Sequence, residues 1–245
     1  MKLEWVSAII LLIPLYTKAT AVHQKFYVAF LLFFHFSTVC AQLPEKEVKM
    51  TIWRNGTLDE WPVEGTVYMD KQFRKGYVLV NGYKNEELAL RYDAYSDEIE
   101  YLDDGKRMLF YKSDHTEVRI DSVVYRLVDY FDRGNVKSGF FTPLNQGETV
   151  LYLRNTKTIF YKAPENGYES FVPPKFMLKT SYYLKRKDRP AMSLNDLSKK
   201  EIFAALWEHY SDLRKYAREN KLRMRTEEEV IQVLNYYDSL LSKTK

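Results

Sequence analysis

Apolar and polar side chains alternate over short segments between residues 65 and 194, and turn residues separate these segments. In the segment 87–93, Leu88, Leu90 and Tyr92 fall on one face, and the residues between them fall on the other. Alternation with a period of two is typical of β-strands. The sequence therefore predicts an antiparallel β-meander over residues 65–194.

Some of the predicted strands are apolar on both faces, as in the run VLYL at 150–153. A strand of this kind has to be covered on both sides. This favours a curved sheet, either rolled around its own core or packed as a sandwich, over a flat sheet with one wet face. Asn-Gly pairs at 55–56, 81–82 and 166–167 are typical of tight turns, as is Gly105 after two aspartates.

The period of the pattern changes to that of a helix after residue 194. Ser198 with Glu201, and Thr226 with Glu229, have the spacing of capping boxes. Apolar residues follow each pair at helical spacing. We expect helices over 195–245 that dock on the sheet, which gives an α+β fold. The two apolar stripes are Ile202, Phe203, Leu206, Tyr210, Leu213 and Tyr216, and then Val230, Val233, Leu234, Tyr237 and Leu241.

The first 41 residues contain two apolar runs, 5–16 and 26–39. Each run is shorter than the roughly 20 residues that a membrane-spanning helix needs. The second run follows Lys25 and ends in Val-Cys-Ala, which is typical of a signal peptide cleaved between Ala41 and Gln42. The sequence therefore predicts export to the periplasm or the cell exterior, with no stable transmembrane span after processing. The segment 42–64 that follows is expected to be an irregular approach to the sheet.

Two apolar runs in tandem are unusual for one signal peptide. Translation from Val22, read as a GTG start codon, would give a compact signal and leave residues 1–21 untranslated. A helical hairpin in a membrane is the alternative, although both runs are short for it. Cys40 could also be a lipoprotein acylation site, but Val39 is bulkier than the residues that precede such a cysteine.

Composition narrows the chemistry of the exported part. From Gln42 onward, 34 Lys and Arg stand against 32 Asp and Glu, a balance that argues against nucleic-acid binding. This part contains no cysteine, which excludes disulfides, cysteine-ligated zinc and a thiol nucleophile. The motifs of zinc proteases, nucleophile elbows and phosphate-binding loops do not occur in it. We expect no cofactor and no metal.

The stretch LRYDAYSDEIEYLDDGK at 90–106 has six carboxylates among three tyrosines. Its spacing does not match a calcium loop, although a looser calcium site at the turn 103–105 is an alternative. A second alternative is a hydrolase pair of Asp93 with Glu98 or Glu100. The interpretation that we favour is structural: Asp97 and Asp103 initiate turns, and Glu98 and Glu100 point to water or to basic neighbours.

Aromatic and charged side chains of the predicted sheet could also bind a ligand. Tyrosine offers a flat face with a polar group, and Tyr111 and Tyr130 are candidates for tyrosines on the solvent side. The basic run 185–187 with Arg189 is expected to be a solvated hairpin tip, with contact to an anionic lipid or polysaccharide as the alternative. The candidate binding residues are Tyr92, Asp93, Tyr95, Asp97, Glu98, Tyr111 and Tyr130.

Several segments occur in an order that resembles a group of secreted proteins of Bacteroidetes-type bacteria. They are LALRYDAYSDEIEY, then GFF and VLYLRN, then YYLK and LSKKEI, and finally YARENKLRMRTEEEVIQVLNYYDSL. The similarity covers about residues 65–242. It implies export and this architecture, and it supplies no catalytic residues.

These observations favour an exported, non-enzymatic envelope or secreted protein that binds a protein, a lipid or a glycan. One alternative is a carboxylate-dependent hydrolase of envelope glycan. The other is a structural or regulatory subunit that docks through its C-terminal helices, where Asn235-Tyr-Tyr-Asp is expected to form a packing cluster.

We predict that translation starts at or near Val22 and that the exported protein begins at Gln42, because only the second apolar run has a good cleavage site. Mass analysis of the N-terminus of the exported protein measures both. A mature form that retains residues 1–21 would contradict the predicted start.

Overall fold

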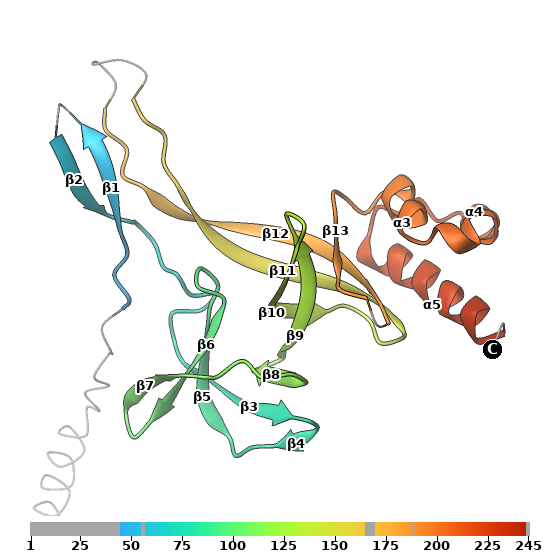
Figure 1. Cartoon of the computed structure of the whole chain (residues 1–245), viewed down its shortest axis with the longest axis horizontal. Helices are drawn as coiled ribbons and strands as arrows, with labels where there is room; N and C mark the ends of the chain where they lie inside the picture. The colour runs from blue at the N-terminus through green and yellow to red at the C-terminus, as the bar shows by residue number, and fades with distance from the viewer. Residues whose placement is uncertain (1–44, 55–56, 165–169, 188, 244–245) are drawn as a thin grey trace, which may run out of the picture. The chain divides into compact units, whose positions relative to one another are not determined.

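The alternating segments form one large antiparallel sheet. The computed structural model describes residues 45–54, 57–164, 170–187 and 189–243 (Figure 1). The predicted signal peptide and its cleavage site at Ala41 and Gln42 lie outside the described residues. None of the described helices is both long enough and apolar enough to cross a bilayer.

Eleven strands of the described residues belong to this sheet, in the order β13-β12-β11-β10-β9-β8-β3-β5-β6-β7, with β4 beside β3. The predicted meander followed by helices is confirmed. The strands are β3 (Arg74–Val80), β4 (Tyr83–Lys84), β5 (Leu88–Asp93), β6 (Glu98–Asp103), β7 (Lys106–Leu109), β8 (Thr116–Ile120), β9 (Val123–Asp132), β10 (Asn135–Pro143), β11 (Thr149–Phe160), β12 (Lys175–Arg186) and β13 (Met192–Leu194).

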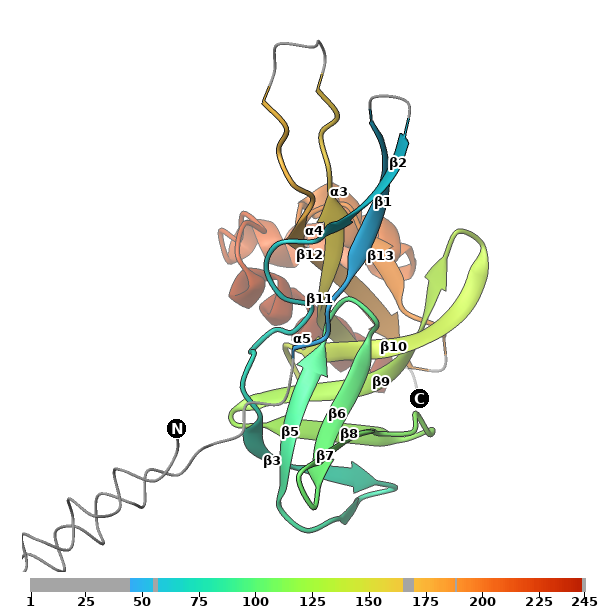
Figure 2. The same ribbon diagram turned by 90° about the vertical axis from the view of Figure 1, so that its left-hand side faces the viewer.

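The sheet bends back on itself at two places. The amide of Lys157 in β11 donates to the carbonyl of Ala94, just after β5, at 2.9 Å. The amide of Ala191, just before β13, donates to the carbonyl of Asp129 in β9 at 2.7 Å. Strands that are several places apart in the sheet order therefore meet, and β9 and β10 form a curved hairpin between them (Figure 2).

The segment 42–64 differs from the expected irregular approach. It contains a second, two-stranded sheet, in which β1 (Lys49–Arg54) pairs antiparallel with β2 (Thr57–Pro62). The reason is visible in the sequence, because the Asn-Gly pair at 55–56 is a strong hairpin signal when strand-forming runs flank it.

The helical end has α3 (Lys199–Ala205), the 3₁₀ turn η2 (Trp207–His209), α4 (Tyr210–Glu219) and α5 (Glu227–Lys243). Ser198 and Thr226 cap as predicted, since each hydroxyl accepts a hydrogen bond from the amide three residues later at 3.4 Å. The first apolar stripe was expected only to have helical spacing, and it is divided between α3 and α4. The chain leaves helical geometry at Leu206, with φ −115° and ψ 36°.

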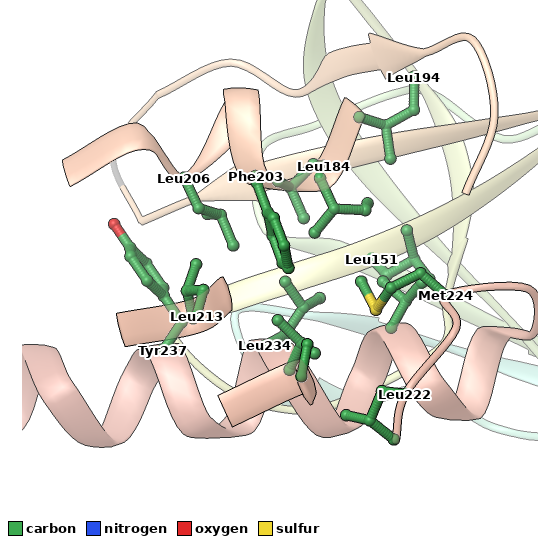
Figure 3. Packing of buried hydrophobic residues seen from close by; sticks show 14 residues of the cluster. Leu151, Leu184, Leu194, Phe203, Leu206, Leu213, Leu222, Met224, Leu234 and Tyr237 are labelled. Carbon is green, nitrogen blue, oxygen red and sulfur yellow. The ribbon is translucent and has the colours of Figure 1, made fainter. Parts of the chain in front are cut away.

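The helices pack on the sheet through one apolar cluster (Figure 3). Leu151 of β11 and Leu184 of β12 supply its floor, and the buried residues of both helical stripes cover them. The docking of the helices is therefore confirmed. The buried members from the helical end are Ile202, Phe203, Leu206, Leu213, Ala217, Leu222, Met224, Val230, Val233, Leu234 and Tyr237.

A carboxylate of α5 fixes the turn between β10 and β11. Asp238 Oδ2 accepts hydrogen bonds from the amides of Glu148 at 3.0 Å and Thr149 at 3.2 Å. A Cβ at Gly147 would lie 2.5 Å from the same oxygen, so a side chain there would displace the carboxylate. The predicted cluster at 235–238 thus includes a polar contact with the sheet.

We predict that Leu234→Ala destabilises the protein by about 2–5 kcal/mol, because it leaves a cavity where α5 meets the sheet. Asn235→Ala, at the exposed neighbouring position, is the matched control and should change stability by about 0.5 kcal/mol or less. Chemical denaturation of both variants measures the difference. Equal stabilities would show that α5 contributes little through this contact.

Candidate functional site

Asp93 closes the turn between β5 and β6. Its Oδ1 accepts hydrogen bonds from the amides of Tyr95 and Ser96, both at 2.9 Å. Its Oδ2 accepts from Lys46 Nζ at 2.8 Å, and the side chain is fully buried. The predicted turn bond is therefore present, but Asp93 makes it, and the expectation that Asp97 does so is wrong.

Asp97 connects distant strands instead. Its backbone is left-handed, with φ +58°, which aspartate tolerates better than most residues. Oδ1 accepts from the Tyr92 hydroxyl at 2.8 Å and from the amide of Phe140 at 3.1 Å. Oδ2 lies 3.1 Å from Lys112 Nζ and 3.5 Å from Arg154 Nη2. The carboxylate thus joins the β5–β6 turn to β10 and β11.

Gly139 leaves the space that this contact needs. A Cβ at position 139 would lie 2.8 Å from Asp97 Oδ2 and 3.1 Å from Arg154 Nη2. In this part of β10 the strand has left β11, since the two pair only at Thr142 and Pro143. The carboxylate therefore accepts the amide hydrogen of Phe140 where no neighbouring strand does.

The guanidinium of Arg154 contacts both a carboxylate and an aromatic ring of this cluster. It lies over the Tyr130 ring, 4.3 Å from the centroid. Burial alone would lower the pKa of the Arg154 guanidinium. The negative charge of Asp97 acts in the opposite direction, and the net effect is a raised pKa. Burial, and then the charge of Asp97, raise the pKa of the Tyr92 hydroxyl, which therefore stays protonated and donates.

Of the two expected environments, water or a basic neighbour, Glu100 has the second, because it is buried against Arg91. Its Oε2 lies 2.7 Å from Arg91 Nη2, and its Oε1 accepts from the Tyr68 hydroxyl at 3.3 Å. The Arg91 guanidinium also stacks on the Tyr68 ring, 3.4 Å from the centroid. Both charged groups are buried. The other face of β5 and β6 therefore carries a buried ion pair whose two charges compensate each other beside an aromatic ring.

The structure brings together only part of the predicted binding set. Tyr92, Asp97 and Tyr130 meet around Arg154. Tyr111 is 85% exposed, as expected. Tyr130 was expected on the solvent side but is only 5% exposed, because Phe141 and Tyr183 pack on its ring.

The other three predicted residues are separate from this cluster. Asp93 accepts the amide hydrogen bonds of the β5–β6 turn, as described above. Tyr95 is partly exposed, and its ring packs edge-on against Phe176 at 5.2 Å. Glu98 is half-buried opposite Asp93 in the β5–β6 register. Among the described residues, no group of three or more His, Cys, Asp and Glu could hold a metal ion.

A different site lies between α3 and α4, in a pocket of about 660 Å³. Four cations and four apolar or aromatic residues line it. No described carboxylate forms an ion pair with any of the four cations. The lining residues are Lys199, Lys200, Phe203, Ala204, Tyr210, Arg214, Ala217 and Arg218. We call this site the α3–α4 groove.

The helix geometry explains how these side chains meet. Leu213 and Ala217 pack into the core, which turns Tyr210, Arg214 and Arg218, spaced by four residues, toward the groove. The break at Leu206 lets α3 face α4, and the rings of Phe203 and Tyr210 meet edge to face at 5.8 Å. The four-residue spacing was visible in the sequence, but the break in the helix was not.

The groove has the chemistry of a binding site for an anion with an apolar part. Lys and Arg supply charged donors, and the aromatic rings supply a flat contact surface. None of its lining residues is an acid, a histidine or a hydroxyl nucleophile of the serine type. The predicted basic hairpin tip at 185–187 is separate from this groove and does not line it.

Comparisons with family models, curated proteins and solved structures found no match. The resemblance to secreted proteins of Bacteroidetes-type bacteria therefore stays a prediction.

We predict that Asp97→Asn destabilises the protein by about 3 kcal/mol, because it leaves the partly buried charge of Arg154 without its counter-ion. Glu98→Gln removes the same charge one residue away and should cost about 0.5 kcal/mol or less. Denaturant unfolding of the two variants measures the contrast. A similar loss in both would contradict the role of Asp97.

Proposed function

We propose that this chain is an exported, non-enzymatic binding protein that holds an anionic ligand in the α3–α4 groove. The observation that carries the proposal is the set of four cations, Lys199, Lys200, Arg214 and Arg218, around one aromatic-lined pocket. Export is supported by the signal-peptide pattern that ends at Ala41.

The charge arrangement favours an external anion. Arg214 and Arg218 lie four residues apart on α4, where like charges destabilise a helix. Lys199 and Lys200 add two more positive charges from α3. In the sheet, by contrast, the buried cation Arg91 lies 2.7 Å from its counter-ion Glu100. An anion in the groove would supply the close ion pairs that the described carboxylates do not form with these four cations.

The core supports the groove on its inner side. Phe203 is buried in the helical cluster while it also lines the groove, and Ala217 does the same from α4. Leu206, at the bend between the helices, is fully buried. A site whose walls belong to a packed core is formed before the ligand arrives, which lowers the entropic cost of binding.

The carboxylates of residues 90–106 support a non-catalytic reading. Asp93, Asp97 and Glu100 each accept hydrogen bonds from groups of the fold itself. A general acid needs a carboxyl group that is free to exchange its proton with a substrate. The hydrolase alternative would have to break one of these contacts to use its residue.

We predict saturable binding of phenyl phosphate, which combines an anion with a ring, and weaker binding of uncharged benzyl alcohol. Arg214→Gln should weaken the binding of phenyl phosphate about tenfold or more, because it removes a charge-assisted hydrogen bond. Lys215→Gln, the adjacent cation that does not line the groove, is the matched control and should change the affinity less than about twofold. Calorimetric titration measures the affinities.

Two results would contradict the proposal. One is the absence of saturable binding to the folded protein. The other is an equal loss of affinity in the Arg214 and Lys215 variants, which would assign the binding to overall charge.

A further inference from the structure

An exposed tryptophan lies in the turn that joins the two walls of the groove. Trp207 belongs to η2, between α3 and α4, and is 67% exposed. Tyr210 follows three residues later, lines the groove and is 48% exposed. Large aromatic side chains are enriched at sites where a protein meets another phase or partner, because one part of the ring is apolar and another is polar.

The same region is strongly basic. Residues 199–225 carry eight Lys and Arg against four Asp and Glu. Two of these acids are already engaged within the fold, since Glu208 pairs with Arg186 at 2.8 Å and Glu201 accepts from Asn195 Nδ2 at 3.1 Å. The surface around the groove therefore combines a net excess of positive charge with exposed Trp and Tyr.

We propose that the ligand is the phosphate of an anionic phospholipid headgroup and that the helical end binds it at the surface of a bilayer. This inference rests on the proposed anion-binding function and adds the source of the anion. Lys and Arg attract anionic lipid headgroups, and Trp and Tyr favour the interface between headgroups and acyl chains. The groove holds the headgroup, and Trp207 enters the interface beside it.

The exposure of Trp207 favours a bilayer over a small soluble anion. A free phosphate in the groove would neutralise Arg214 and Arg218 but would leave Trp207 in water, because Trp207 does not line the groove. A bilayer surface would cover both features at once.

The contact is peripheral. The apolar residues of α5, such as Val230, Val233 and Leu234, are fully buried in the core and do not face outward. Binding therefore depends on the four groove cations and on the two exposed rings. A surface contact of this kind is sensitive to salt, since the Debye length falls to about 10 Å at 0.1 M ionic strength.

The test uses the protein that begins at Gln42, which contains the whole compact unit Glu45–Lys245 and leaves out the N-terminal apolar runs. Co-sedimentation is measured with vesicles of equal parts phosphatidylglycerol and phosphatidylcholine, and with vesicles of phosphatidylcholine alone. We expect binding to the anionic vesicles only, and a loss of this binding as the salt concentration rises.

Three variants separate the contributions. Arg214→Glu changes the charge by two units and should weaken vesicle binding about 25-fold, at roughly fivefold for each unit charge near an anionic surface. Trp207→Ser should weaken it about fivefold through the lost apolar contact. Lys106→Glu makes the same charge reversal on the exposed edge strand β7, at the far end of the strand order, and should weaken it less than about twofold.

The outcomes distinguish this inference from the proposed function. Binding of phenyl phosphate without binding to anionic vesicles overturns the bilayer as the source and leaves the proposed function intact. If the protein binds an acidic polysaccharide but not anionic vesicles, the bilayer is likewise overturned as the source of the anion and the proposed function stands. Failure to bind phenyl phosphate and vesicles alike overturns both. An equal effect of Trp207→Ser on phenyl phosphate and on vesicles would place Trp207 in the groove and contradict its role at the interface.

Discussion

The carboxylate of Asp97 is the contact on which the shape of the sheet depends. It lies in a turn between β5 and β6, and besides Tyr92 of β5 it binds Phe140 of β10, Arg154 of β11 and Lys112. The neighbouring backbone bond from Lys157 to Ala94 joins the same parts of the sheet. Since a partly buried cation is costly without its counter-ion, this cluster favours one arrangement of the strands. The role of Asp97 in the acid-rich stretch is therefore structural: its carboxylate holds distant strands together.

The two charged regions of the molecule differ in how they are compensated. In the sheet, the cations of Arg91 and Arg154 lie against carboxylates and aromatic rings. In the α3–α4 groove, Arg214 and Arg218 have aromatic and apolar neighbours and no described carboxylate as an ion-pair partner. The rigid frame built by the first region holds the helices, through Leu151 and Leu184, so that the second region is presented on a fixed surface.

Local patterns in the sequence predicted the parts of the structure that depend on neighbouring residues. The strand alternation and the caps at Ser198 and Thr226 are of this kind. Contacts between distant residues could not be predicted. Asp93 also binds Lys46, and Asp97 binds Phe140, across 47 and 43 residues of sequence. The burial of Tyr130 and the break at Leu206, which forms the groove, likewise depend on packing partners that no local period reveals.

Amide hydrogen exchange at Phe140 tests the structural role of Asp97 most directly, because this amide donates to the carboxylate at 3.1 Å. The account predicts that Asp97→Ala accelerates exchange at Phe140 well beyond the change at Leu184 in β12, while Glu98→Gln leaves Phe140 unchanged. Local opening of this kind would show that the carboxylate holds β10 in place. Exchange at Phe140 that is unaffected by Asp97→Ala would contradict the account.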